Sequence, residues 1–229
     1  TNVSQEQCSN NLTHCAWNTD NNECYEHYAF QEYYKNSLKV DPATTLNIYS
    51  LELGGTLGFA TFPMPEYPPT PNEEYMDGVV LHYTTLTELG NSNYQFNQGD
   101  TGIHEVGHYL GLFHTWGDGN CTIDDEVTDT PNHDGTVDTD GNQTLDIYEC
   151  IDNLDTCTDA GLDPIENFMN YSPDSCMYMF SEEQKDRMLY MIDNYRSSLG
   201  SELSLFDTQV PEEFSIKSIY PNPFNPSTT

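Results

Sequence analysis

The chain is constrained most strongly by an eleven-residue stretch, HEVGHYLGLFH, which runs from His104 to His114. On a helix, residues four positions apart lie on the same face, so His104 and His108 direct two imidazoles at one point. Glu105, the next residue round the helix, is placed to reach a water held there. Gly111 permits the left-handed backbone that ends a helix, after which His114 can return as a third nitrogen ligand. Three histidines with an open fourth position are a catalytic zinc pattern, because structural zinc sites are closed, usually by cysteines.

The alternative for this stretch is a buried amphipathic helix that is rich in histidine by coincidence. Five specified positions within eleven residues argue against that alternative. The spacing therefore predicts hydrolysis by a zinc-activated water, with Glu105 as the general base.

Charge and cysteine content indicate which partners the protein can bind and in which compartment it folds. The 229 residues include 38 acidic and 6 basic ones, a formal net charge of −32, which argues against binding to nucleic acid or to an anionic membrane. Such acidity favours calcium binding and a salty habitat, although a well-solvated surface accounts for most of it. No apolar run approaches the roughly 18 residues of a membrane span. Seven cysteines without a CxxC pair indicate disulfides and an oxidising compartment, so we expect a secreted or cell-surface monomer.

The hydrophobic pattern predicts an α+β fold built from short elements. We expect a helix over residues 25–37, strands at 46–53, 57–62 and 77–86, the zinc helix from Thr101, and a last helix over 181–200 with Ser181 as N-cap. The Pro-rich stretch 63–74 must lie on the surface, because its prolines cannot join a strand ladder. His82, in the third strand, is expected to be structural, since the zinc already has three ligands.

Composition divides the chain into four segments. Residues 1–40 are polar and contain three cysteines, residues 41–200 are the expected catalytic domain, 201–214 a linker and 215–229 a short terminal segment. The first segment starts at Thr1 without an initiator Met or a signal peptide, so we interpret that end as processed or fragmentary. It is either an appendage or the truncated start of the catalytic domain.

Three separated motifs resemble the pappalysin family of metzincin metalloproteases. They are the zinc motif, the DTP tripeptide at Asp129 to Pro131, and ENFMNYSPDSCMYMF at residues 166–180. The resemblance extends from about Val40 to Arg187 and includes KVDPATTLNIY and DGVVLHY. It implies that Met169 forms the Met-turn beneath the histidines. It also implies that Tyr171 stabilises the oxyanion that develops during peptide hydrolysis.

The resemblance further implies a fold in two parts. The upper subdomain has a twisted, mixed, five-stranded sheet and the zinc helix, and a smaller, irregular lower subdomain contains the Met-turn and a C-terminal helix. Only three strand candidates precede His104, so we expect the family's first strand and helix to be missing or unrecognisable here. Two crossed disulfides, Cys121–Cys157 and Cys150–Cys176, are implied in the lower subdomain, where they replace a hydrophobic core.

Two calcium sites are predicted. Family members bind calcium near the DTP turn, where the matching positions are Asp125 and Thr130. A second site is indicated by DTDGNQTLDIYE, in a region that is longer than the family pattern. Its oxygen side chains occupy positions 1, 3, 5, 7, 9 and 12 of an EF-hand-type loop, namely Asp138, Asp140, Asn142, Thr144, Asp146 and Glu149. Gln143 stands where that loop has its glycine, and the alternative is an acidic turn that is only solvated.

Substrate preference and export are also implied by resemblance. In family members an aspartate just after the Met-turn lies at the base of the pocket for the residue after the cut. The matching residue is Asp174, so we expect cleavage on the amino side of Arg, then of Lys. Otherwise Asp174 is a solvated acid or a calcium ligand.

The ending YPNPFNPSTT resembles the start of a bacterial C-terminal domain for Por (type IX) secretion, with a Pro-rich linker as the alternative.

Together these features predict a secreted bacterial zinc endopeptidase that acts on proteins or peptides and contains catalytic zinc and structural calcium. The rival from another class is a calcium-stabilised surface or adhesion protein with a vestigial zinc site. The intact Glu105 argues against that rival, because a binding site has no need of a base there. A hydrolase of non-peptide amides is a third possibility, which the Met-turn disfavours.

Overall fold

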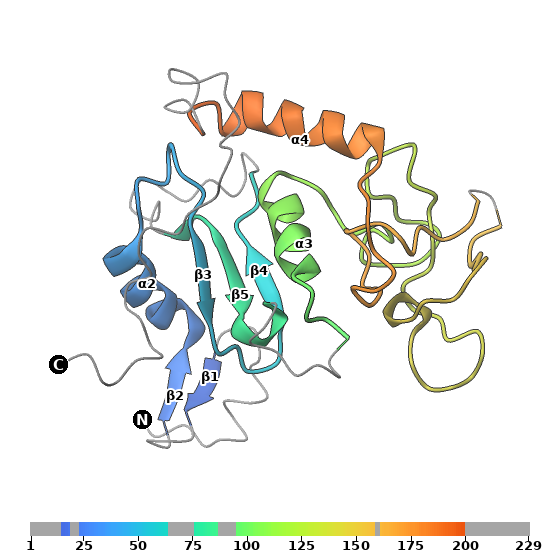
Figure 1. Cartoon of the computed structure of the whole chain (residues 1–229), viewed down its shortest axis with the longest axis horizontal. Helices are drawn as coiled ribbons and strands as arrows, with labels where there is room; N and C mark the ends of the chain where they lie inside the picture. Colours follow the sequence, from blue (N-terminus) through green and yellow to red (C-terminus); the bar gives the residue numbers. More distant parts are fainter. Residues whose placement is uncertain (1–14, 19–22, 64–75, 87–94, 159–160, 200–229) are drawn as a thin grey trace.

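A small mixed sheet with one helix on each side forms the first half of the molecule, and a loop-rich region forms the second (Figure 1). The computed structural model describes residues 15–18, 23–63, 76–86, 95–158 and 161–199. The expected linker at 201–214 and the terminal segment at 215–229 lie outside them. No described helix is long and apolar enough to cross a membrane.

The central sheet has the strand order β3–β5–β4. The strands are β3 (Ile48–Leu51), β4 (Gly58–Ala60) and β5 (Val79–His82). β5 is parallel to β3 and antiparallel to β4, so the sheet is mixed. These strands confirm the three predicted ones, although each is shorter than expected. The sheet has three described strands where the resemblance implied five.

Alternation along β5 assigns its two sides to different helices, because successive side chains in a strand point to opposite faces. Val80 packs with Tyr49 on one face, whereas Val79 and Leu81 pack with Tyr109 on the other. All three β5 residues are buried. A strand covered on both faces reads as a continuous apolar run, which explains why it was recognisable in the sequence.

Helix α2 (His27–Leu38) covers the Val80 face and agrees with the helix predicted over 25–37. Its Tyr34 packs edge-on against Tyr49, and the Lys35 ammonium donates to the Met76 carbonyl oxygen at 2.6 Å. Burial lowers the pKa of Lys35 to about 8. This part of the polar segment 1–40 is therefore packed onto the sheet.

A short hairpin precedes α2. Its strands, β1 (Cys15–Asn18) and β2 (Glu23–Glu26), pair antiparallel in a separate two-stranded sheet. The sequence did not predict it, because its strands lie in a polar segment without a hydrophobic alternation. The region before β3 thus contains two strands as well as a helix.

Helix α3 (Asp100–Tyr109) carries the first part of the zinc motif and begins one residue before the predicted start. Gly99 is its N-cap, with a left-handed φ of 99°, and Asp100 places an acidic side chain in the first turn. At the other end, Tyr109 is fully buried against β5. The helix is therefore fixed to the sheet close to the histidines.

Helix α4 (Glu182–Tyr195) lies across the top of the molecule in Figure 1. Ser181 is its N-cap, as predicted: its hydroxyl accepts from the Gln184 backbone N–H, and the Gln184 side chain accepts from the Ser181 N–H. The helix ends at Tyr195 instead of Gly200. The reason is that Arg196 leaves helical geometry, and its guanidinium binds buried groups of the other half of the molecule.

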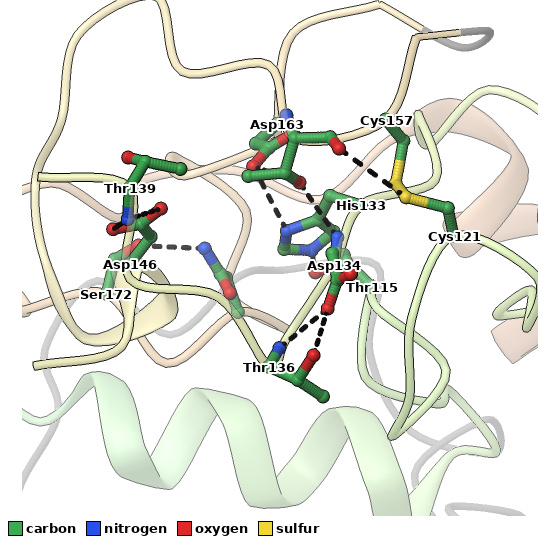
Figure 2. A network of polar contacts seen from close by, with 12 residues as sticks. Thr115, Cys121, His133, Asp134, Thr136, Thr139, Asp146, Cys157, Asp163 and Ser172 are labelled. Carbon is green, nitrogen blue, oxygen red and sulfur yellow. Dashed lines mark hydrogen bonds and ion pairs between the residues drawn. A yellow bond between two sulfur atoms is a disulfide. The ribbon is translucent and has the colours of Figure 1, made fainter. Parts of the chain in front are cut away.

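The loop-rich half between α3 and α4 is held by covalent and polar contacts. Both implied disulfides are present, Cys121–Cys157 and Cys150–Cys176, with Cα–Cα distances of 5.6 and 6.1 Å. Figure 2 shows a buried polar network beside the first of them. In it, His133 Nε2 lies 2.8 Å from the Thr115 hydroxyl, and His133 Nδ1 lies 3.7 Å from the Asp163 carboxylate. Polar contacts thus take the place of a large apolar core here.

Candidate active site

The three histidines of the motif converge on one point. His108 Nε2 lies 3.0 Å from Nε2 of His104 and 3.0 Å from Nε2 of His114. Gly111 has a φ of +92°, and this left-handed residue turns the chain so that His114 returns to the helix, as predicted. Within the described part of the chain, no other group of three or more His, Cys, Asp or Glu side chains has the geometry of a metal site.

The outer nitrogens of the rings fix their protonation. Each Nδ1 has an oxygen partner: the Phe168 carbonyl for His104, the Leu112 carbonyl for His108 and the Asp118 carboxylate for His114. Since the proton lies on Nδ1, each Nε2 presents a lone pair to the same point. Three lone pairs this close repel one another unless a cation lies between them. The donors therefore fit a divalent ion such as Zn²⁺, which takes imidazole nitrogens at about 2.0–2.1 Å.

Burial also favours the metal-binding form of two of these rings, His104 and His108. Burial, followed by the neighbouring histidines, lowers the pKa of His104 well below its ordinary value and that of His108 to about 4. A neutral imidazole is the form that coordinates a metal ion. His104 and His108 are therefore in the metal-binding form at neutral pH.

Glu105 lies beside the cluster and lines the same cavity of about 280 Å³ as His104. It is 6% exposed, and burial raises its pKa to about 8. A carboxylate that can hold a proton near neutral pH suits general acid–base catalysis, and a nearby cation would bring its pKa down. Room for this side chain comes from β4, because a Cβ on Gly58 would lie only 2.8 Å from Glu105 Cγ.

Both halves of the molecule line the cavity. Residues 55–58, which lead into β4, form one side, and Tyr148, Tyr171 and Met177 come from the loop-rich half. β4 is at an edge of the described sheet. An extended peptide can add to such an edge through main-chain hydrogen bonds.

Met169 lies fully buried against the zinc helix. A Cβ on Gly107 would lie 2.4 Å from the Met169 sulfur, so this glycine allows the close contact. The Met169 N–H donates to the Asn167 side chain at 2.9 Å, and its carbonyl accepts from the Thr115 N–H at 3.2 Å. The turn at Met169 is thus bonded to the segment that follows the third histidine.

Tyr171 packs among aromatic rings at the cavity. Its centroid lies 4.8 Å from His114, 4.6 Å from Trp116 and 5.6 Å from Tyr148, onto which it stacks at 19°. Burial raises its pKa above the ordinary value. Its hydroxyl therefore stays protonated at neutral pH and can donate a hydrogen bond into the cavity.

The family model described as Pregnancy-associated plasma protein-A (Peptidase_M43) matches residues 39–193, which is more than half of the chain. The chain belongs to this family, the pappalysins. Its mixed α+β fold is close to that of mirolysin, a metzincin.

Curated relatives of this pappalysin include extracellular metalloproteases of fungi. That of Sordaria macrospora is 38% identical over 167 residues, which cover 72% of this chain and 54% of the relative. Extracellular metalloprotease 1 of Coccidioides posadasii is 34% identical over 183 residues, covering 80% and 59%. The chain therefore spans little more than half the length of the curated relatives it matches.

A solved structure of the same kind is mature mirolysin of Tannerella forsythia in complex with a cleaved peptide. It is 30% identical, with a TM-score of 0.62, over 78% of this chain and 67% of that one. Mirolysin in complex with a small compound is 33% identical, with a TM-score of 0.58, over 71% and 58%.

Asp174 of this pappalysin is not among the residues that line the cavity. Its side chain is buried, Oδ2 accepts the Gln98 N–H at 2.6 Å, and Oδ1 has no hydrogen-bond partner. It also lies near Asp100, whose pKa is raised to about 6 by burial and then by the Asp174 charge. The Asp174 carboxylate is thus enclosed at the start of the zinc helix, where the backbone N–H groups of Gln98, Gly99 and Asp100 favour its charged form.

The expected calcium ligands fall into two groups. Asp125 is buried, and both its oxygens accept from the Thr130 hydroxyl, at 2.9 and 2.8 Å. In the acidic loop, Asp138 accepts the backbone N–H groups of Gly141 and Gln143 at 2.7 and 2.8 Å. Gln143 has a φ of +76°, so it adopts the left-handed turn for which the EF-hand loop has glycine.

Within the same loop the side chains are not all directed to one point. The Asn142 amide donates to the Glu149 carboxylate at 2.9 Å and to Asp140 at 3.2 Å. The backbone of Thr144 donates to the Asn142 side-chain oxygen at 2.7 Å. Asp146 is instead buried, and the Thr139 N–H donates to it at 3.2 Å.

Three residues of the site were not found from the sequence: Gly58, Asp118 and Tyr148. A glycine inside a strand often marks a close approach by another group, and this signal was present at Gly58. An acid four residues after the third histidine was a weaker signal for Asp118. Nothing in the sequence indicated that the acidic loop delivers Tyr148 to the cavity.

Proposed function

We propose that this pappalysin is a secreted, zinc-dependent endopeptidase. The observation that carries the proposal is the convergence of three histidines, in which His108 Nε2 lies 3.0 Å from Nε2 of both His104 and His114. The buried Glu105 lines one cavity together with His104. An adhesion protein with a vestigial metal site has no need of this carboxylate. Support for a peptide substrate comes from the similar mirolysin structure, which holds a cleaved peptide.

The protein's own groups account for the proton movements and for substrate placement. When held by the histidines, zinc supplies a Lewis acid that lowers the pKa of a water. Glu105 takes a proton from the attacking water and later passes it to the leaving amine. Tyr171 donates a hydrogen bond to the developing oxyanion. The peptide lies extended along β4, antiparallel to it, where Glu105 faces the strand at Gly58.

The proposed activity is tested with casein as a general protein substrate. We expect cleavage that a chelator abolishes and that added zinc restores. A protein that rebinds zinc stoichiometrically and leaves casein and a peptide library uncut would favour the adhesion protein. Release of ammonia or a small amine from non-peptide amides only would favour the third class of function.

We further propose that Asp174 selects Arg, and less strongly Lys, after the scissile bond. The proposal rests on the resemblance, because Asp174 is enclosed and does not line the cavity. A carboxylate that a substrate guanidinium reaches binds it through charge-assisted hydrogen bonds. We expect peptides with Arg at this position to be cut at least about tenfold faster than those with Leu, judged by kcat/KM. Asp174→Asn, which keeps the acceptor for Gln98, should remove most of this preference and spare the Leu peptide.

This preference must be separated from the attraction of the whole acidic protein for basic peptides. Long-range attraction is screened by salt, whereas contact in a pocket persists. The peptides are therefore compared at low and high salt. Equal cleavage before Leu and before Arg in the wild type would exclude the proposed role of Asp174.

We propose that calcium stabilises the loop-rich half, at Asp138 to Glu149 and at Asp125 with Thr130. Calcium that binds only the folded state raises stability, by about 2.7 kcal/mol at a hundred times its Kd. Asp138→Ala combined with Asp140→Ala should remove one calcium, lower the melting temperature in calcium and leave zinc content unchanged. The exposed pair Asp152→Ala with Asp155→Ala loses the same charge elsewhere and is the matched control.

Calorimetry and elemental analysis give the calcium count of each protein. Unchanged stoichiometry in the Asp138 and Asp140 double variant would mean that the loop is a solvated turn. Loss of calcium in the control pair as well would place the ion outside the loop.

Secretion by a bacterial Por (type IX) route is a separate proposal. It rests on the resemblance of the ending YPNPFNPSTT, which lies outside the described residues. The extracellular assignment of the curated relatives supports secretion itself. Fusion of residues 215–229 to a reporter protein in a Por-secreting bacterium tests whether this segment takes part in export.

A further inference from the structure

The turn that follows the third histidine has an unusual backbone. Gly117 and Asp118 are both left-handed, with φ of +59° and +61°. Glycine adopts this conformation freely, but it is uncommon for residues with a side chain, even though aspartate tolerates it better than most. Strained residues of this kind persist where the surrounding structure or the function requires them.

The left-handed turn returns the Asp118 carboxylate to His114. Asp118 Oδ1 accepts a hydrogen bond from His114 Nδ1–H, and the Gly117 N–H donates to the His114 carbonyl at 2.9 Å. Trp116 lies flat on the His114 ring, with centroids 4.4 Å apart and an interplanar angle of 3°. The ring is thus held on one face by an indole and at its outer edge by a carboxylate.

This support distinguishes His114 from the other two histidines. His104 and His108 are part of α3, whose geometry directs their rings, and their Nδ1 atoms donate to backbone carbonyls. His114 lies on a loop and has an anionic partner instead. The Asp118 side chain is 66% exposed, so its position is not dictated by packing in a core.

A carboxylate on the outer nitrogen of a metal-binding histidine has two effects. It fixes the proton on Nδ1, which leaves Nε2 for the metal, and it makes the imidazole a stronger base and therefore a better ligand. Partners of this kind typically change metal affinity by about 10–100-fold. The turn places Asp118 where both effects act on the one ligand that the helix does not position.

We propose that Asp118 is a positioning residue that holds His114 as the third ligand and raises the affinity of the site for zinc. The inference rests on the proposed zinc site and adds a residue that the histidine motif does not contain. If this is so, loss of the Asp118 side chain lowers the zinc affinity of the protein but does not lower the stability of its metal-free form.

The test compares Asp118→Gly and Asp118→Asn with the wild type. Zinc affinity is measured on the metal-free proteins by competition with a chromophoric chelator, and unfolding of the same metal-free proteins is followed by circular dichroism. We expect Asp118→Gly to bind zinc about 10–100-fold more weakly, without a lower unfolding midpoint, because glycine is unstrained at this φ. Asp118→Asn keeps an acceptor but loses the charge, so its affinity should lie between the two.

Glu126→Gly is the matched control. Glu126 is also an exposed acid with a left-handed backbone, at a φ of +64°, and its carboxylate binds Arg187 instead of a histidine. Its zinc affinity should equal that of the wild type. Unchanged zinc affinity in Asp118→Gly would overturn the proposal, and so would a fall in affinity matched by an equal fall in the control. A wild type that binds no zinc would instead overturn the proposed function.

Discussion

Replacing Glu105 by Gln is expected to lower kcat/KM for peptide hydrolysis by about 10²–10⁴-fold, because the variant has no group that can take a proton from water. Glutamine has nearly the shape of glutamate, so it fits the space that Gly58 leaves beside β4. The three histidines are untouched, and zinc content should remain at the wild-type level. Activity is measured with a fluorogenic peptide and zinc by elemental analysis of the same preparation.

The control for this prediction is Glu182→Gln, which changes an exposed acid in the first turn of α4. It should retain wild-type kcat/KM. If Glu105→Gln kept more than a few per cent of the activity, another group would have to be the base. Loss of zinc in Glu105→Gln would mean that the effect arises from the metal site instead of from proton transfer.

The convergence of the three histidines could be predicted because their arrangement is local. Helical spacing puts His104 and His108 on one face, and a glycine at position 111 allows the turn that brings His114 back. The buried strand β5 was also recognisable, since an apolar run covered on both faces has few alternatives. Local geometry of this kind depends little on the rest of the chain.

Features that depend on distant contacts could not be predicted. Gly58 matters only because α3 brings Glu105 against β4, and Tyr148 only because the acidic loop folds back over Tyr171. The position of Asp118 depends on two successive left-handed residues, of which the sequence shows only a Gly-Asp pair. In each case the residue type is ordinary and its partner comes from another element.

The sequence also could not predict which apolar residues of helix α4 are buried. Met188, Leu189, Met191 and Ile192 form an apolar pattern, which predicts one covered face. The helix lies across the molecule, so Met191 is buried against Gly111 but Leu189 is 52% exposed, and the prediction for Leu189 was wrong.

His82, expected to be structural, is bonded to Glu52 and Thr84 and lies outside the histidine cluster.

Arg196, the residue that follows α4, is expected to contribute strongly to the stability of the fold. Arg196 is 10% exposed and donates to both oxygens of Asp77, at 2.9 and 3.1 Å. It also donates to the carbonyls of Tyr109 and Thr61, and its guanidinium lies 3.5 Å from the centre of the Tyr109 ring. One side chain thus joins α4 to the end of α3, to β4 and to the start of β5.

Removing either partner of this pair leaves a buried charge without its counterion. We expect Arg196→Ala or Asp77→Ala to lower the free energy of unfolding by about 3–5 kcal/mol. For a protein of this size that corresponds to a fall of roughly 6–20 °C in melting temperature. Calorimetry in excess calcium and zinc measures it, and Lys185→Ala, which removes an exposed ion pair with Glu182, should leave the melting temperature unchanged.

The double variant, Asp77→Ala with Arg196→Ala, shows whether the loss of stability in each single variant comes from breaking the ion pair. If most of the cost of each single change comes from the charge left behind, Asp77→Ala with Arg196→Ala should be destabilised by much less than the sum of the two. Additive losses would show instead that Arg196 acts mainly through the carbonyls of Tyr109 and Thr61 and through the Tyr109 ring. Because Tyr109 ends the helix that carries His104 and His108, the single variants should also bind zinc more weakly at temperatures just below their melting point. Zinc affinity that stays constant up to unfolding would mean that the ion pair stabilises the fold without positioning the metal site.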